Sequence, residues 1–185
     1  VTEKGRTPAV VLWLVAAAFV VILNETIMMN AIPQLMVGLD IDEAAAQWLS
    51  TAFLLTMASV IPVTGWFLQR VSTRTAFKVA MSVFIAGTLL AALAPAYSVL
   101  LVARIVQASG TAVMMPLLMT TLMKVVAERD RGRVMGNVTL VMSVAPALGP
   151  AVAGLLLQLG SWRLMFLTVL PIAVVITVLA LRRLP

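Results

Sequence analysis

Two charged residues, Glu25 and Arg104, lie inside long apolar stretches of the sequence. A charge at the centre of a membrane-spanning helix costs about 2.5–3.5 kcal/mol on insertion scales, and such residues usually have a function. A carboxylate can bind and release a proton, and a nearby guanidinium keeps it ionised until a proton or a substrate competes. The two residues therefore predict proton coupling, with Glu25 as the proton-binding group. The alternative is that both charges are buried parts of the scaffold.

The composition indicates that lipid surrounds most of the chain. Of 185 residues, 62% are hydrophobic and 11% are charged, against roughly 45–50% and 25% in soluble domains. The absence of cysteine and histidine excludes disulfides and thiol catalysis, and predicts that there is no metal site. There is no nucleotide-binding glycine loop and no nucleophile beside a base, so we expect neither an enzyme nor a bound cofactor.

Six apolar stretches are each long enough to cross a bilayer as a helix. They cover residues 9–35, 46–69, 76–95, 98–124, 134–159 and 163–181. The sequence therefore predicts an all-α integral membrane protein, a bundle of six transmembrane helices over residues 1–185. Prolines at similar places in the first and fourth helices, Pro33 and Pro116, are compatible with a three-plus-three repeat.

The charges between the stretches predict the orientation. Eleven basic residues flank one end of the helices: Lys4, Arg6, Arg70, Arg74, Lys78, Lys124, Arg129, Arg131, Arg133, Arg182 and Arg183. The other end has Arg163 alone. Since Lys and Arg collect on the cytoplasmic side, both termini should be cytoplasmic. The basic residues form short clusters rather than one hydrophilic face, so the net charge of +6 does not indicate nucleic-acid binding.

Polar and flexible side chains near the two charges are candidates for a substrate cavity. Helix 1 runs outward and helix 4 inward, so Glu25 and Arg104 should lie at similar depth. Asn24 and Asn30 accompany Glu25, and Gln107 and Met115 accompany Arg104. Methionine suits a pocket that accepts varied apolar ligands, although ordinary packing also explains it. Hydrogen bonding between helices is the alternative for the polar residues.

Five segments together resemble the fourteen-helix drug:proton antiporters of the major facilitator superfamily, the EmrB/QacA and lincomycin-resistance-like branch. They are "LNETIMMNAIPQL" (23–35), "GWFLQRVSTRTAFK" (65–78), "RIVQASG" (104–110), "GNVTLVMSVAPALGPAVAG" (136–154) and "SWRLMFLTVLPIA" (161–173). They follow the family's order and occupy the corresponding helices. The resemblance implies the N-terminal half of a major facilitator fold.

The resemblance also assigns roles to particular residues. It implies that Arg104 takes part in proton transfer, that Gly65, Arg70 and Arg74 form the cytoplasmic loop motif, and that the fifth helix carries the antiporter motif. The antiporter-motif residues are Gly136, Gly149, Pro150 and Gly154. The family's acidic position in helix 1 is Asn24 here, and Glu25 is the adjacent carboxylate.

By this resemblance, the chain exports amphipathic, lipophilic or cationic drugs across the cytoplasmic membrane, with the proton gradient as energy source. Membrane lipids surround it, and either a missing C-terminal half or a second copy completes the cavity. Two other functions remain open: a membrane scaffold or assembly partner that does not transport, and a proton symporter for a small nutrient.

Overall fold

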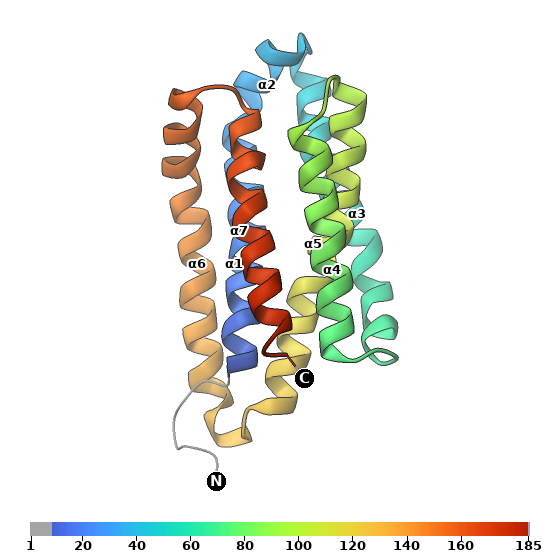
Figure 1. Ribbon diagram of the computed structural model, residues 1–185, viewed down its shortest axis with the longest axis vertical. Helices are drawn as coiled ribbons and strands as arrows, with labels where there is room; N and C mark the ends of the chain where they lie inside the picture. The colour runs from blue at the N-terminus through green and yellow to red at the C-terminus, as the bar shows by residue number, and fades with distance from the viewer. Residues whose placement is uncertain (1–8, 185) are drawn as a thin grey trace.

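The computed structural model describes residues 9–184, which form seven helices (Figure 1). The helices are α1 (Ala9–Asn30), α2 (Ile32–Leu39), α3 (Glu43–Leu68), α4 (Thr73–Ala92), α5 (Tyr97–Val125), α6 (Glu128–Leu159) and α7 (Arg163–Leu181). Six are long and apolar enough to cross a membrane, and α2 is the exception. This confirms the predicted bundle of six membrane helices.

The first predicted helix, 9–35, is divided in the structure. Helix α1 ends at Asn30, and the short helix α2 begins at Ile32 with Pro33 in its first turn. Proline has no N–H to donate to the preceding turn, and its ring crowds the carbonyl four residues earlier, so an uninterrupted helix is disfavoured there. The sequence range was therefore too long, because it joined a membrane helix to a separate helix at its end.

Three helices, α3, α4 and α6, begin three or more residues earlier than predicted, each at a polar residue. Asp42 caps α3 by accepting a hydrogen bond from the backbone N of Ala45 at 2.8 Å. Ser72 caps α4 by accepting one from the backbone N of Thr75 at 3.2 Å. Helix α6 begins at Glu128 and not at 134, with two carboxylates in its first turn, where negative charge favours a helix. Ranges based on apolar residues alone omitted these turns.

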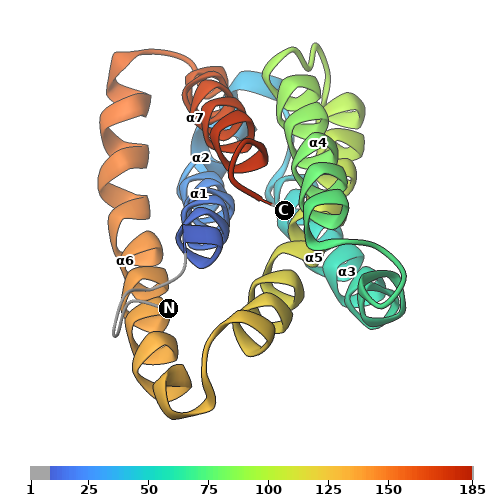
Figure 2. The ribbon, with the colours of Figure 1, turned by 60° about the horizontal axis from the view of Figure 1, so that its bottom comes forward.

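The six long helices pack as two related groups of three. Helix α1 packs mainly on α6 and α7, and α5 packs mainly on α3 and α4. The groups meet where α1 contacts α5 and α4 contacts α7. Figures 1 and 2 show α1 and α7 between α6 and the group α3–α5. In a three-plus-three repeat, α1, α3 and α4 correspond in order to α5, α6 and α7. Under this correspondence each main contact matches another main contact or itself, which supports the repeat.

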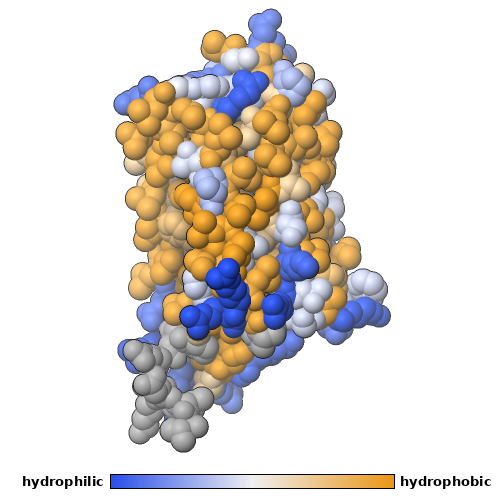
Figure 3. Space-filling view, viewed as in Figure 1, coloured by the Kyte–Doolittle hydropathy of each residue, from blue (hydrophilic) through white to orange (hydrophobic). Residues whose placement is uncertain are grey.

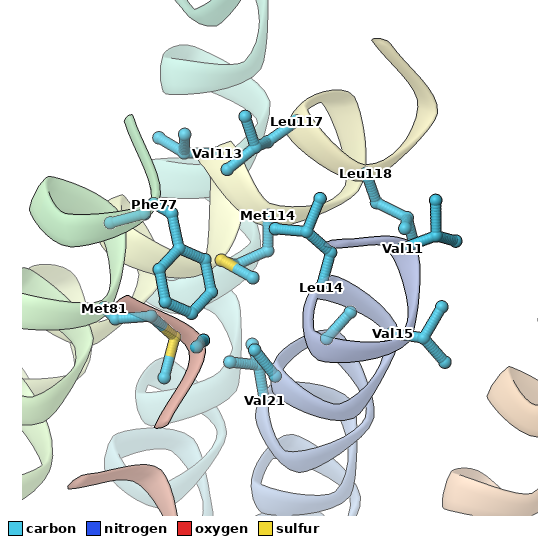
Figure 4. Packing of buried hydrophobic residues seen from close by; sticks show 14 of the residues in the cluster. Val11, Leu14, Val15, Val21, Phe77, Met81, Val113, Met114, Leu117 and Leu118 are labelled. Atoms are coloured by element: carbon cyan, nitrogen blue, oxygen red, sulfur yellow. The ribbon is translucent and has the colours of Figure 1, made fainter. Parts of the chain in front are cut away.

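The buried side chains form two apolar clusters, one toward each end of the bundle. The first contains Leu14 of α1, Phe77 of α4 and Met114 of α5 (Figure 4). The second contains Met28 of α1 and Leu100 of α5. On three helices, polar residues occupy the sequence between the two clusters: Asn24 and Glu25 on α1, Thr88 on α4, and Arg104, Gln107 and Thr111 on α5. The bundle therefore contains a polar layer at middle depth.

The surface matches a membrane environment. On the face in view, Figure 3 shows a broad apolar band across the middle of the bundle and hydrophilic residues toward its two ends. The first residue of α1 and the last residue of α7 lie at the same end, as six crossings require (Figure 1).

Candidate functional site in the polar layer

Arg104 is the most deeply buried charge in the described part of the chain. Its side chain is 0% exposed. One guanidinium nitrogen, Nη1, donates to Oε1 of Gln107 at 2.6 Å, one turn further along α5. The carbon at the centre of the guanidinium lies 4.0 Å from the ring centroid of Phe53, on α3. The Nε atom is buried without a partner among residues 9–184. Neutral groups therefore hold this cation.

Gln107 connects Arg104 to α4. Its Nε2 donates to Oγ1 of Thr88 at 2.8 Å, and the Thr88 hydroxyl donates to the carbonyl of Phe84 at 2.8 Å. Gln107 is also 0% exposed, so both ends of its amide are used inside the protein. This arrangement fixes the Arg104 side chain relative to two helices. The prediction that Gln107 contacts substrate stays a prediction.

Glycines allow α4 and α5 to approach closely at this level. A Cβ atom on Gly87 would lie 2.5 Å from the backbone N of Gln107, and one on Gly110 would lie 2.5 Å from the carbonyl O of Ala80. Only glycine leaves room for such backbone contact. The short distance between the helices is what brings Thr88 within reach of Gln107.

On α1, the polar residues have different surroundings. Asn24 is 2% exposed, and its Nδ2 has no partner among the described residues. Glu25 is half-buried. Thr26 donates its hydroxyl to the carbonyl of Ile22 at 3.0 Å, and the exposed Asn30 donates Nδ2 to the carbonyl of Thr26 at 2.8 Å. Of the two neighbours Asn24 and Glu25, only the glutamate is partly open to its surroundings.

Glu25 and Arg104 lie in the same layer, as their sequence positions predicted. Their helices, α1 and α5, pack against each other. The two residues form no ion pair within 4.0 Å, since Arg129 and Asp130 make the only ion pair found within residues 9–184. The carboxylate therefore shares the polar layer with a fixed positive charge to which it is not bonded. This is an arrangement in which a carboxylate can gain or lose a proton without breaking a salt bridge.

The remaining predicted residues lie outside the polar network. Met115 is 38% exposed on α5. In the loop motif, Gly65 and Arg74 are exposed, and the guanidinium of Arg70 lies 4.1 Å from the ring centroid of Trp66. These positions leave the roles assigned to the three loop residues as predictions.

The antiporter-motif residues divide between buried and open positions. Gly149 packs so closely against Thr26 that a Cβ atom would overlap the threonine side chain. Gly136 and Gly154 have no neighbour within 4 Å of such an atom, and Pro150 is exposed. One motif glycine therefore joins α6 to α1 beside Glu25, whereas the other two lie on an uncovered side of α6.

Sequence reasoning missed Phe53, Thr88 and Gly87. Thr88 carries a hydroxyl group inside an apolar stretch, which is a weak signal of a polar contact. The adjacent Gly87 is a weak signal of close helix packing. Nothing in the sequence distinguishes Phe53 from other aromatic residues in apolar stretches.

A double-mutant cycle can measure the contact between Phe53 and Arg104. We expect Phe53→Leu and Arg104→Met to show a coupling energy of about 2 kcal/mol, the size of a desolvated cation–π contact. The measurement is the thermal stability of the two single variants and the double variant in the purified full-length protein. Additive effects would show that Phe53 contributes packing alone.

A groove between α2 and the connection from α6 to α7 is separate from the polar layer. Its volume is about 570 Å³, and it is lined by Pro33, Gln34, Val37, Gly38, Ser161, Trp162 and Arg163. Arg163 also donates Nη2 to the carbonyl of Ala94 at 2.7 Å and thereby joins α7 to the connection between α4 and α5. The groove contains none of the predicted site residues.

The six-helix bundle with a polar layer at middle depth is the architecture of a multi-pass membrane transport domain. Residues 14–185 match the Major Facilitator Superfamily, and the chain belongs to this family. Its similarity to solved structures supports the same fold. A D-xylose-proton symporter gives a TM-score of 0.79 at 16% identity, over 95% of this chain and 47% of that one. A bacterial homologue of the human lysosomal transporter Spinster gives 0.73 at 18%, over 95% and 43%.

Curated relatives are transporters and drug-resistance proteins of bacteria. The chain is 44% identical to the uncharacterized MFS-type transporter YcnB of Bacillus subtilis, over 90% of this chain and 35% of that protein. It is 40% identical to the lincomycin resistance protein LmrB of Bacillus subtilis, over 94% and 36%. It is 34% identical to the putative multidrug resistance protein MdtD of Shigella flexneri, over 94% and 37%. The chain thus spans about a third of the length of these relatives.

Proposed function

We propose that this chain forms the N-terminal half of a transporter that exports amphipathic drugs in exchange for external protons. The observation that carries the proposal is the fully buried Arg104 in the polar layer, with Glu25 in the same layer on α1, which packs against α5. Similarity to a lincomycin resistance protein supports drugs as substrates. The proton gradient supplies the energy, and no cofactor takes part.

The coupling step depends on the different surroundings of the two charges. Gln107 and Phe53 hold Arg104 in place, and both are neutral, so its charge acts on Glu25. Glu25 is half-buried and can exchange protons with a water-filled cavity. Proton binding at Glu25 and drug binding in the cavity then favour different conformations as the two halves of the transporter rock about the site.

The cavity wall proposed here lies on α1 and α5. Asn30 and Met115 are exposed on these helices, and with Asn24 and Gln107 they are the candidate substrate residues. The uncovered side of α6 at Gly136 and Gly154 would face the missing C-terminal half. Because the relatives are about three times as long as the matched segment, a second half is the partner we propose rather than a second copy.

The orientation follows from the charges. The end of the bundle that carries nine of the described basic residues, where α1 begins and α7 finishes, should face the cytoplasm. These nine residues are Arg70, Arg74, Lys78, Lys124, Arg129, Arg131, Arg133, Arg182 and Arg183. The other two residues of the predicted set, Lys4 and Arg6, lie outside the described residues.

The proposal can be tested with the full-length protein in proteoliposomes that contain a pH-sensitive dye. With an imposed proton gradient, a fluorescent lipophilic cation should be transported, and protons should move in the opposite direction. A protonophore should abolish the transport. Proton movement in the same direction as the substrate would indicate a symporter. If the folded protein moved neither protons nor any drug of a panel, the result would favour a scaffold that does not transport.

A further inference from the structure

Four exposed basic residues form a patch where α4 begins and α7 ends. Arg74 and Lys78 lie in the first two turns of α4, and Arg182 and Arg183 follow α7. Helices α4 and α7 pack against each other, and α4 begins at the end of the bundle where α7 finishes (Figure 1). Figure 3 shows hydrophilic side chains gathered there, at the lower end of the face in view. We call these four residues the α4–α7 basic patch.

The charges of this patch are not neutralised within the described structure. None of the four side chains donates a hydrogen bond to another residue in the range 9–184. The only ion pair in that range is between Arg129 and Asp130, on α6. Helix α6 is not among the helices that pack substantially on α4. Four like charges at one corner repel one another, so an external anion is favoured there.

The direction of the α4 side chains supports a joint surface with α7. Arg74, Lys78, Met81 and Ile85 follow one stripe of α4, with spacings of four, three and four residues. Met81 is buried and Ile85 packs in the apolar cluster that also contains Ala173 and Ala180 of α7. The inner part of the stripe therefore packs in a cluster to which α7 contributes, and Arg74 and Lys78 continue this stripe to the beginning of α4.

An exposed apolar stripe leads from the patch into the membrane region of α7. Val175, Val178 and Leu179 share one face of the helix with Arg182, because they precede it by seven, four and three residues. Their side chains are 55%, 45% and 40% exposed. A positive charge at the end of an apolar stripe matches a ligand that has an anionic head and hydrocarbon chains.

We propose that the α4–α7 basic patch binds the phosphate headgroup of an anionic phospholipid, with an acyl chain along the apolar stripe of α7. Guanidinium groups form charge-assisted hydrogen bonds with phosphate oxygens, and basic residues at the ends of membrane helices attract anionic lipids. The apolar stripe favours a lipid over a soluble phosphate, because burial of the chain adds to the attraction of the head. This inference does not depend on the transported substrate.

The test is a lipid titration of the purified full-length protein in a zwitterionic detergent, followed by native mass spectrometry with phosphatidylglycerol as the probe. The variant Arg182→Gln/Arg183→Gln should lower the apparent affinity about tenfold, because two of the four charges are lost. The matched control Lys124→Gln/Arg133→Gln removes the same charge from exposed positions on α5 and α6 and should bind as the unaltered protein does.

Three results would overturn the proposal. The first is an equal loss of binding in both double variants, which would indicate general charge attraction. The second is no loss in the patch variant while a thermal melt shows that it is folded. The third is equal retention of phosphatidylcholine with the same chains. Glycerol phosphate, which has the head without the chains, should not displace the lipid, and efficient displacement would contradict the role of the α7 stripe.

Discussion

Replacing Glu25 by glutamine should reduce proton-driven export by roughly 100-fold, the scale of effect expected when a positioned proton-transfer group is lost. Glutamine keeps the size and hydrogen-bonding capacity of the side chain but cannot bind or release a proton near neutral pH. Arg104 would then act on a residue without charge. The measurement is gradient-driven transport of a fluorescent drug in proteoliposomes, together with equilibrium drug binding, which should change little.

The matched control is Glu43→Gln. Glu43 is an exposed residue in the first turn of α3, and its carboxylate accepts a hydrogen bond from Gln47 at 3.1 Å. The same chemical change there should leave export unaffected. The double variant Asn24→Asp/Glu25→Gln places a carboxylate at the family's usual position. Because Asn24 is 2% exposed, we expect no recovery of export. Gradient-driven export by Glu25→Gln at the normal rate would remove Glu25 from the coupling mechanism.

Replacing Gly87 by alanine should destabilise the protein by about 3 kcal/mol, at the upper end of the usual cost of overpacking. The added Cβ would lie 2.5 Å from the backbone N of Gln107 and 2.8 Å from its Cα. Backbone atoms cannot rotate away as a side chain can, so α4 and α5 must separate. Their separation would weaken the Gln107–Thr88 hydrogen bond and loosen Arg104. Thermal unfolding of the purified protein measures the loss.

Gly132→Ala is the control for this substitution. Gly132 lies near the start of α6, and nothing lies within 4 Å of an added Cβ atom. Alanine is a better helix former than glycine by about 1 kcal/mol, so stability should stay constant or rise. If both alanine variants had the same stability, the close contact between α4 and α5 would not be a constraint on the fold.

The positions of the membrane helices could be predicted because apolar length is a local property of the sequence. The last helix has the predicted bounds, 163–181. The predicted bounds were wrong where a helix continues beyond the apolar residues that lie in the membrane, or where an apolar segment does not continue the membrane helix. Glu43, Thr73 and Glu128 begin helices although they are polar, because their turns can lie in water. The chain from Ile32 to Leu39 is apolar, yet it forms a separate helix after the break near Pro33.

The candidate site was predictable in part. Glu25 and Arg104 were conspicuous because charge is rare inside apolar stretches, and the number of residues from each helix end indicated their common depth. The partners of Arg104 were not predictable. Phe53 and Thr88 come from two other helices, and their proximity depends on packing. Nor could spacing reveal that Gly149 contacts Thr26 while Gly136 and Gly154 stay uncovered.

The amino-acid sequence by itself determined that this chain has six helices long and apolar enough to cross a membrane, with two charges at middle depth and basic residues at one end. These properties follow from the cost of placing each residue in lipid or in water, which depends on the residue and its near neighbours. Only the tertiary structure decided that Arg104 is held by neutral groups and that Glu25 makes no ion pair within residues 9–184. These contacts join helices that are distant in sequence and depend on how closely glycines let the helices approach.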